Sequence, residues 1–289
     1  MTTFAIIGAG SMLGKELVRQ LLNTGQTVIK IGRGVDNDIV FDLVSEFNPD
    51  SCKGLKADVI LHCASTFEGD SIVGAKINFQ TNALGCLNVF SLMDTLSCRY
   101  CCYAGTVTSY EDFDPMRMNG YGLSKAQGEA ILEWRLSNAF CSLRLTGLYD
   151  TEGVCCTHQP WFGRIVAYAS RGEPLKLPSS LGKRNYMHIS DAASLMIASA
   201  EKELTGCWSA CHSESYDHAE IAELAFHVFG SGGNAIIDET KSPFRRVNYP
   251  SGQPLFNRIL HEPKITMVEG LNLIVSSGFS GNFGPMDVQ

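Results

Sequence analysis

Tyr121 and Lys125 are the residues whose types and spacing most directly suggest chemistry. They stand four positions apart in the segment YGLSK, and on a helix that spacing places both side chains on one face. A lysine ammonium beside a phenol stabilises the phenolate and lowers the tyrosine pKa from about 10 toward neutral pH, as a proton shuttle requires. The pair is a candidate for moving a proton on and off a substrate oxygen. A surface pair at this spacing is the alternative interpretation.

A threonine hydroxyl precedes this pair in the chain. The apolar run Tyr100–Ala104 predicts a strand that leads through Gly105 into Thr106. The Thr106 hydroxyl would then stand at the carboxyl end of a sheet, where parallel α/β sheets bind their ligands. Thr106 is therefore the third catalytic candidate, and both Thr106 and Thr108 are candidates for substrate binding.

The segment IIGAGSMLG predicts a dinucleotide site near the start of the chain. It lies where a predicted strand, Phe4–Ile7, turns into a predicted helix, Ser11–Asn23. Glycines at such a junction let the backbone approach a pyrophosphate, whose charge meets the free N–H groups of the helix. The third glycine stands one residue later than in GxGxxG, so a tight structural turn is the alternative. The candidate cofactor-binding residues of this loop are Gly8, Gly10, Ser11, Met12, Leu13 and Gly14.

Arg33 bears on which dinucleotide is bound. The second predicted strand, Thr27–Ile31, leads into the sequence Gly-Arg-Gly. At this point NAD-binding chains place an acidic residue for the ribose 2′-hydroxyl, whereas an arginine accommodates the 2′-phosphate of NADP. Arg33 therefore favours NADP, with NAD as the alternative cofactor, and a solvated surface arginine is the competing interpretation.

Strand-like runs alternate with helical patterns through the first half of the chain, and this predicts the fold. Such alternation implies right-handed crossovers and a Rossmann-type, doubly wound parallel sheet of the α/β class. After Tyr149 the alternation breaks, which indicates a smaller α/β substrate-binding lobe. We expect a dinucleotide-binding domain over residues 1–150, with 184–212 returning to it, and the lobe over 151–183 and 213–289. The other predicted elements are strands at Val59–His62 and Cys141–Leu145 and helices at Asn78–Leu96, Gly122–Ser137, Trp161–Ser170 and His218–Phe229.

Composition excludes several classes of partner. The 289 residues include 23 Lys and Arg against 30 Asp and Glu, a net charge of −7, with no basic block. Binding to nucleic acid is therefore not expected. No apolar run approaches the length of a membrane helix, so we expect no membrane span. The first residues lack a basic segment, so we expect no signal peptide. We therefore expect a cytoplasmic protein.

Eleven cysteines are an odd and rather high number. In a chain that is not exported they are expected to be reduced thiols that pack as small apolar residues. The pair Cys98-x-x-Cys101 has half the spacing of a zinc site, but no second pair stands at a convincing distance from it. No bound metal is expected.

Taken in order, several segments resemble the extended short-chain dehydrogenase/reductase family, the group of NAD-dependent epimerases, dehydratases and reductases of nucleotide sugars. The resemblance covers most of the chain, and no single segment carries it alone. One departure is Ser11, which stands where the family commonly has a glycine. The matching segments are Gly8–Gly14, Phe41–Leu43, Val59–Ser65, Asn78–Phe90, Thr106, Tyr121–Lys125, Leu143–Tyr149, Arg184–Asp191 and the stretch from Gly206.

The resemblance assigns roles to particular residues. It implies that Thr106, Tyr121 and Lys125 are catalytic and that Arg184 meets the phosphates of the substrate. Tyr121 and Lys125 would also contact the cofactor. The further cofactor-binding residues that it implies are Asp42 and Leu43 at the adenine, and Cys63, Ala64, Ser65 and Asn82 beside the cofactor.

Departures from the family narrow the expected reaction. Fourteen residues separate Thr106 from Tyr121, so the loop over the substrate is short, and Val107-Thr108 replaces the acidic pair of the dehydratases. The short chain resembles the 4-keto reductases. We therefore expect an NADP(H)-dependent oxidoreductase that reduces a 4-keto group of a nucleotide-activated deoxysugar. Three alternatives stay open: a nucleotide-sugar 4-epimerase with retained NAD, a reductase of a non-sugar carbonyl, and a non-catalytic NADP-sensing protein. The oligomeric state also stays open, with a homodimer as one option.

Overall fold

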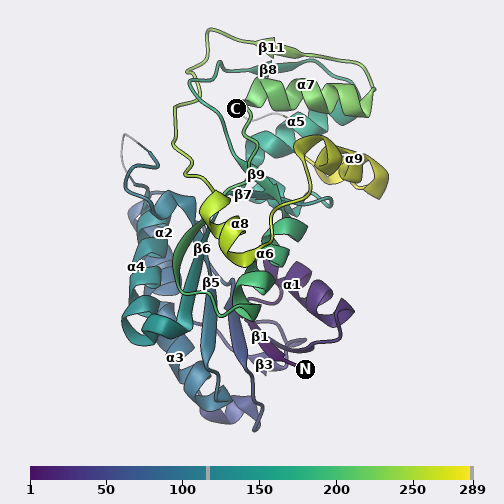
Figure 1. The fold of residues 1–289 in the computed structure, drawn as a ribbon. Coiled ribbons are helices and arrows are strands. Elements are labelled where there is room, and N and C mark those ends of the chain that lie inside the picture. The colour runs from purple at the N-terminus through teal and green to yellow at the C-terminus, as the bar shows by residue number, and fades with distance from the viewer. Residues whose placement is uncertain (115–117, 287–289) are drawn as a thin grey trace. The chain divides into compact units, whose positions relative to one another are not determined.

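The computed structural model describes residues 1–114 and 118–286. Its chain divides into two compact units (Figure 1). The first unit consists of Met1–Leu145, Ala192–Ala210 and Gly252–His261, and the second of Thr146–Asp191, Cys211–Ser251 and the residues from Glu262.

The first unit is built on a seven-stranded sheet in the order β10-β6-β5-β4-β1-β2-β3. Every neighbouring pair is parallel. Strands covered on both faces read as continuous apolar runs, as the four buried residues Val59–His62 do. The predicted Rossmann-type sheet is confirmed. Its strands are β1 (Thr3–Ile7), β2 (Thr27–Gly32), β3 (Ile39–Val40), β4 (Val59–His62), β5 (Tyr100–Thr106), β6 (Phe140–Leu145) and β10 (Gly206–Ala210).

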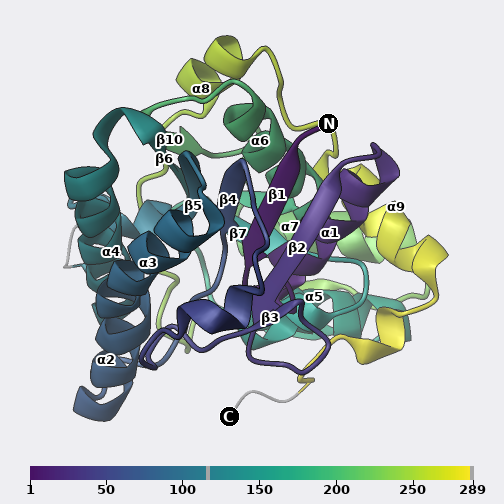
Figure 2. The ribbon, with the colours of Figure 1, turned by 90° about the horizontal axis from the view of Figure 1, so that it is seen from below.

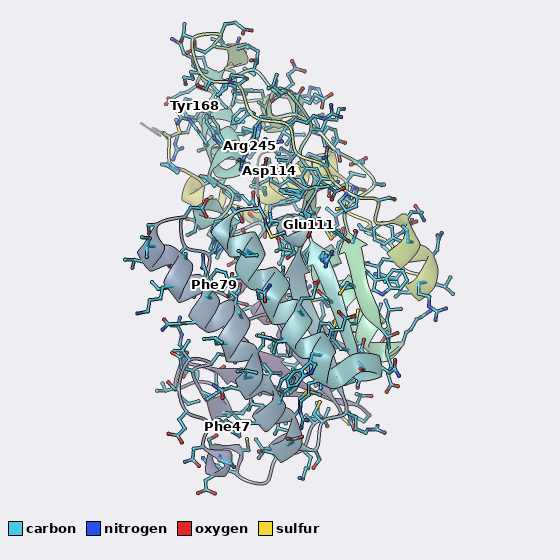
Figure 3. All side chains as sticks on the ribbon, turned by 90° about the vertical axis from the view of Figure 1, so that its left-hand side faces the viewer. Phe47, Phe79, Glu111, Asp114, Tyr168 and Arg245 are labelled. Carbon is cyan, nitrogen blue, oxygen red and sulfur yellow. The ribbon has the colours of Figure 1, made fainter. Side chains whose placement is uncertain are left out.

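Helices cover both faces of this sheet. Figure 2 shows α2, α3 and α4 on one face and α1 and α6 on the other, and Ser194 of α6 donates a hydrogen bond to Gln20 of α1 over 3.0 Å. Between α2 and α3 the chain forms a π-helical segment, η2, and Figure 3 labels its Phe79. The helices are α1 (Met12–Asn23), α2 (Ile72–Asn78), η2 (Phe79–Leu84), α3 (Gly85–Leu96), α4 (Gly120–Leu136), α6 (Ile189–Glu201, from Ala192 onward in this unit) and α8 (Gln253–Ile259).

The second unit holds two small parallel pairs of strands and three longer helices. Helix α5 packs against α7, and α7 against α9. Both α7 and α9 begin with a capping box, in which Asp217 pairs with Glu220 and Thr266 with Glu269. The elements are β7 (Gly147–Tyr149) paired with β9 (Tyr186–His188), β8 (Leu175–Leu177) paired with β11 (Ala235–Ile237), α5 (Pro160–Arg171), α7 (His218–Phe229) and α9 (Met267–Ser277).

Several elements differ from the sequence prediction. The helical stretch expected from Asn78 begins at Ile72, and the edge strands β3 and β10 were not predicted. The helices α8 and α9 were not predicted either. Gly270 inside α9 has a packing reason, because a Cβ at this position would collide with the Tyr149 hydroxyl. Glycine disfavours a helix, but in α9 it allows a close contact within the second unit.

Candidate active site

Two glycines of the loop between β1 and α1 are required by the fold. Gly8 has φ +86°, and a Cβ on it would lie 2.7 Å from the Ala64 backbone nitrogen. A Cβ on Gly14 would collide with the Gly8 carbonyl oxygen. Gly10 differs, since a Cβ there would meet nothing within 4 Å. The loop therefore packs tightly against β4 but leaves its backbone approachable at Gly10, beside the first turn of α1, where free N–H groups favour an anion.

Ser11 and Cys63 join the glycine loop to the end of β4. Ser11 is the N-cap of α1, and its Oγ accepts a hydrogen bond from the Gly14 nitrogen at 3.0 Å. The same hydroxyl lies 3.8 Å from Cys63 Sγ, and the thiol donates to the Ile7 carbonyl at 3.2 Å. Burial raises the pKa of Cys63 to about 11, so it is a neutral thiol at neutral pH. The serine that replaces a common family glycine thus serves as a helix cap.

The loop stands at the point where the strand order reverses. β1 pairs with β4, with Ile7 opposite His62, and the chain continues from β1 into α1 and from β4 toward α2, on opposite faces of the sheet (Figure 2). Open α/β sheets bind ligands in the crevice at such a switch point. Met12 and Leu13 are the first two residues of α1 at this point. The Leu13 side chain is buried, so the start of this helix offers a ligand its backbone N–H groups and not that side chain.

The residues expected to bind the adenosine end of the dinucleotide also belong to the first unit. Arg33 is exposed in the loop that follows β2. In that loop the Asp38 carboxylate accepts a hydrogen bond from the Lys30 nitrogen at 2.8 Å. Asp42 is half-buried and its Oδ1 accepts from the Val44 nitrogen, whereas the Leu43 side chain is buried in the core.

Thr106 and the first turn of α4 meet at the end of β5. The Thr106 and Thr108 hydroxyl oxygens are 3.0 Å apart, and Thr106 Oγ1 accepts from the Thr108 nitrogen at 3.3 Å. A Cβ on Gly122 would collide with the Thr108 carbonyl oxygen. Asn119 caps α4 by accepting from the Gly122 nitrogen at 2.7 Å. The glycine that follows Tyr121 in the motif therefore lets α4 begin directly against the Thr106–Thr108 turn. Residues 115–117 of the intervening loop lie outside the described residues.

Tyr121 is half-buried, and its ring packs edge-on against Phe67 with 4.5 Å between the ring centroids. Burial raises the pKa of Tyr121 to about 12, and a side-chain hydrogen bond with Ser65 acts in the opposite direction. This differs from the expectation that Lys125 would lower the pKa of the phenol. Tyr121 is a neutral phenol at neutral pH and can act as a proton donor.

Lys125 is buried to 2% exposure, and its Nζ lies 4.0 Å from the centroid of the Tyr103 ring. Burial lowers the pKa of Lys125 to about 8, although Cys86, Glu129 and Cys63 act to raise it. The ammonium thus lies over the aromatic face of Tyr103 in β5.

Asn82 positions this region. It is 1% exposed in the π-helical segment η2, and its Nδ2 donates to Ser124 Oγ at 3.0 Å and to the Thr66 carbonyl at 2.9 Å. Its Oδ1 accepts from the Thr66 nitrogen at 2.9 Å. Ser124 in turn donates to the Tyr121 carbonyl at 2.8 Å. Sequence reasoning assigned Asn82 to the cofactor and missed Ser124 and Thr66, although Ser124 stands inside the YGLSK motif.

Arg184 belongs to the second unit, whereas all the other predicted site residues belong to the first. Its backbone pairs with Tyr216, and its guanidinium donates to the Lys183 carbonyl at 3.3 Å and to the Arg245 carbonyl at 2.7 Å. A pocket of about 420 Å³ in this unit is lined by Lys183 and Arg246 among others. These two cations were not among the predicted site residues.

Neither a membrane span nor a metal cluster is found in the described residues. In residues 1–114 and 118–286, no helix combines the length and the apolar character needed to cross a bilayer. The same part of the chain holds no group of three or more His, Cys, Asp or Glu side chains arranged to bind a metal ion.

Comparison with known proteins identifies the family of this chain. Residues 4–206 match the model of the NAD dependent epimerase/dehydratase family. A UDP-glucose 4-epimerase from Pisum sativum is 24% identical, over 69% of this chain and 72% of its own. The UDP-N-acetylglucosamine 4-epimerase from Bacillus cereus superposes with a TM-score of 0.81 at 19% identity, covering 95% of this chain and 98% of its own. The structure of RMD from Pseudomonas aeruginosa complexed with NADPH gives 0.79 at 19% identity, covering 97% and 100%.

The family match spans well over half of the sequence and includes the glycine loop, Thr106, Tyr121 and Lys125. The solved structures show the same fold. The chain therefore belongs to the NAD dependent epimerase/dehydratase family and is an enzyme of the extended short-chain dehydrogenase/reductase type.

Proposed function

We propose that this enzyme reduces the 4-keto group of a nucleotide-activated deoxysugar with NADPH. The observation that carries the proposal is the position of Tyr121 on the first turn of α4, because this turn packs directly onto the Thr106–Thr108 turn. Reduction of a carbonyl needs a proton donor at the oxygen, and a tyrosine with a pKa of about 12 is protonated at neutral pH.

The first unit has the features that a dinucleotide needs. The open backbone at Gly10 and the first turn of α1 suit the pyrophosphate, and the exposed Arg33 suits a 2′-phosphate. When bound, a nicotinamide dinucleotide supplies the hydride. The family description names NAD, and the Pseudomonas aeruginosa relative was solved with NADPH. Arg33 is our reason for choosing NADPH for this chain.

Three side chains would perform the acid–base part of the reduction. The Tyr121 hydroxyl donates its proton to the substrate oxygen as the carbonyl becomes an alcohol. The Thr106 hydroxyl donates a hydrogen bond to the same oxygen and so stabilises the negative charge that develops there. The Lys125 ammonium favours the phenolate that Tyr121 leaves, until solvent returns the proton.

The second unit has a pocket whose cations suit the phosphates of a nucleotide. Its pocket presents Lys183 and Arg246, and Arg184 lies next to Lys183 in the chain. Arginine and lysine side chains bind phosphate groups through charge-assisted hydrogen bonds. A diphosphate is therefore the substrate group that we assign to this pocket.

The eleven cysteines support a cytoplasmic location, where thiols stay reduced.

A nucleotide-sugar 4-epimerase is the second candidate. It is favoured by the Pisum sativum and Bacillus cereus relatives, both of which are described as 4-epimerases. An epimerase uses the same hydride chemistry twice and regenerates its cofactor internally, so it would retain NAD and show no net redox change.

One experiment tests the proposal against this alternative. The purified protein is screened with nucleotide 4-keto sugars and NADPH, and the absorbance of the reduced cofactor is followed together with loss of the keto sugar. We expect the protein to purify largely free of nucleotide and to oxidise NADPH in a one-to-one ratio with substrate. Tightly bound NAD, with interconversion of a nucleotide hexose in the absence of NADPH, would show the epimerase instead.

A further inference from the structure

Helix α4 carries a third ionisable residue on the face that holds Tyr121 and Lys125. Glu129 follows Lys125 by four positions, as Lys125 follows Tyr121, so successive turns present the three side chains on one side of the helix. Glu129 is buried, with 4% exposure. A buried carboxylate is costly unless it is paired and hydrogen-bonded, so its surroundings decide its role.

Glu129 is held by residues of β6. Ser142 Oγ donates to Glu129 Oε2 at 2.5 Å, Arg144 Nε donates to Oε1 at 3.0 Å, and a second Arg144 nitrogen completes the ion pair. Burial acts against the charged Arg144 guanidinium, but the hydrogen bond and ion pair with Glu129 outweigh it and raise the Arg144 pKa. The two side chains therefore form an ion pair in a largely buried setting.

The same pair is built into the elements that carry Thr106. Gly105 directly precedes Thr106, and a Cβ on Gly105 would lie 3.2 Å from Glu129 Oε2 and would collide with Ser142 Oγ. The Arg144 guanidinium carbon lies 4.1 Å from the centroid of the Tyr110 ring, just beyond the Thr106–Thr108 turn. The Glu129 carboxylate is thus fixed next to the reacting end of β5.

Lys125 is surrounded by ionisable groups from four elements. The charge of each group at the pH where Lys125 titrates decides its effect on the lysine. Cys86 and Cys63 act to raise its pKa, but burial raises the pKa of these thiols to about 12 and about 11. Both thiols are therefore neutral at the pH where Lys125 titrates, near 8. Glu129, the third group that opposes the effect of burial on Lys125, differs from the thiols because its carboxylate forms an ion pair with Arg144. Three further ionisable groups of this region are neutral at this pH: His62, with a pKa of about 3, Tyr103, whose pKa burial raises, and Tyr121, with a pKa of about 12.

We propose that Glu129 is a positioning residue whose carboxylate, fixed by Arg144 and Ser142, holds Lys125 in its cationic form beside the reacting groups. A fully buried lysine would otherwise lose its proton near neutral pH. The inference deepens the proposed function, because there the Lys125 cation stabilises the phenolate of Tyr121. Arg144 acts one step further away, by fixing the Glu129 carboxylate.

The test measures the protonation of Lys125 directly. The full chain is labelled with 13C at the lysine Cε, the Lys125 signal is assigned from its absence in Lys125→Arg, and its chemical shift is followed against pH. In Glu129→Gln we expect the Lys125 midpoint to fall by about one pH unit, a tenfold change in proton affinity. The matched control is Glu133→Gln, which removes the same charge from an exposed position one turn later on α4 and should leave the midpoint unchanged.

A second variant covers the case in which Glu129→Gln does not fold. Glu129→Gln leaves Arg144 as a buried unpaired charge, whereas the double variant Glu129→Gln/Arg144→Met removes both charges together and avoids that penalty. It should also lower the Lys125 midpoint. A midpoint within about 0.2 pH unit of the unmodified protein in the folded variants would overturn the inference.

The titration needs neither substrate nor cofactor, so its result stands whatever the keto-sugar screen shows. Absence of turnover in that screen would refute the proposed reaction, whereas an unmoved Lys125 midpoint would refute the role of Glu129. Where turnover is found, the alkaline limb of kcat/KM should move to lower pH in Glu129→Gln and stay in place in Glu133→Gln. A merely structural role for Glu129 would lower the rate without moving that limb.

Discussion

The Asn82 side chain donates a hydrogen bond to Ser124 Oγ over 3.0 Å, and this contact joins the π-helical segment η2 to the helix that carries Tyr121 and Lys125. The same amide group pairs with both backbone groups of Thr66, just beyond β4. One buried side chain therefore sets the spacing between the chain after β4 and helix α4.

Asn82→Ala should weaken both the fold and the site. It removes all three hydrogen bonds and leaves the Thr66 backbone groups without their partner, which should lower the free energy of unfolding by about 1–3 kcal/mol. Urea unfolding measures this, with Gln80→Ala, at an exposed position of the same segment, as the control. Equal urea midpoints for the two variants would show that Asn82 does not hold the segment.

Tyr121→Phe should abolish turnover while leaving NADPH affinity nearly unchanged, because it removes only the hydroxyl that donates the proton. Single-turnover oxidation of NADPH and cofactor titration by fluorescence measure the two properties separately. Activity within a few-fold of the unmodified enzyme would rule Tyr121 out as the acid.

Substitutions of two loop glycines should separate folding from cofactor binding. Gly14→Ala would place a Cβ against the Gly8 carbonyl oxygen, so we expect a lower melting temperature. Gly10→Ala meets nothing within 4 Å, so it should melt like the unmodified protein but bind NADPH at least tenfold more weakly, because its methyl group occupies the approach to the backbone. Full NADPH affinity in Gly10→Ala would place the pyrophosphate elsewhere.

Arg33→Ala should remove most of any preference for NADPH over NADH. A charge-assisted hydrogen bond between arginine and phosphate contributes about 1.5–3 kcal/mol, which corresponds to roughly a ten- to a hundred-fold difference in Kd. Arg99→Ala, at another exposed arginine of the first unit, is the control. Equal affinities for the two cofactors before any substitution would mean that Arg33 only faces water.

Lys125 should make the stability of the enzyme rise with pH above 8. Its pKa is about 8 in the folded chain against an ordinary 10.5, so between these values the unfolded chain binds more protons and alkali favours folding. At pH 7 the buried charge costs about 3 kcal/mol. Lys125→Met should therefore be the more stable protein at pH 7, and its advantage should shrink toward pH 10. Urea midpoints measured across this range check the prediction, and a difference that does not vary with pH would contradict it.

Much of the fold follows from the sequence because the parallel sheet is buried on both faces. The runs at Phe4–Ile7, Val59–His62 and Tyr100–Ala104 are apolar for that reason, and each stands between helical patterns. The short edge strands β3 and β10 carry no such signal, since an edge strand of two to five residues needs little continuous apolar sequence. α9 was missed because the sequence does not show that Gly270 makes room for Tyr149.

The sequence by itself determined which residue types are available for chemistry and which family they resemble, because motif spacing along a helix or at a strand end is a local property. Tertiary structure decided the charge state and the contacts that those residues have in the folded protein. It buries Lys125 over the Tyr103 ring, keeps Tyr121 a neutral phenol and brings Asn82 to Ser124, forty-two positions away in the sequence. Charge state and hydrogen-bond partners depend on burial and on residues distant in the chain, and only the folded protein brings these together.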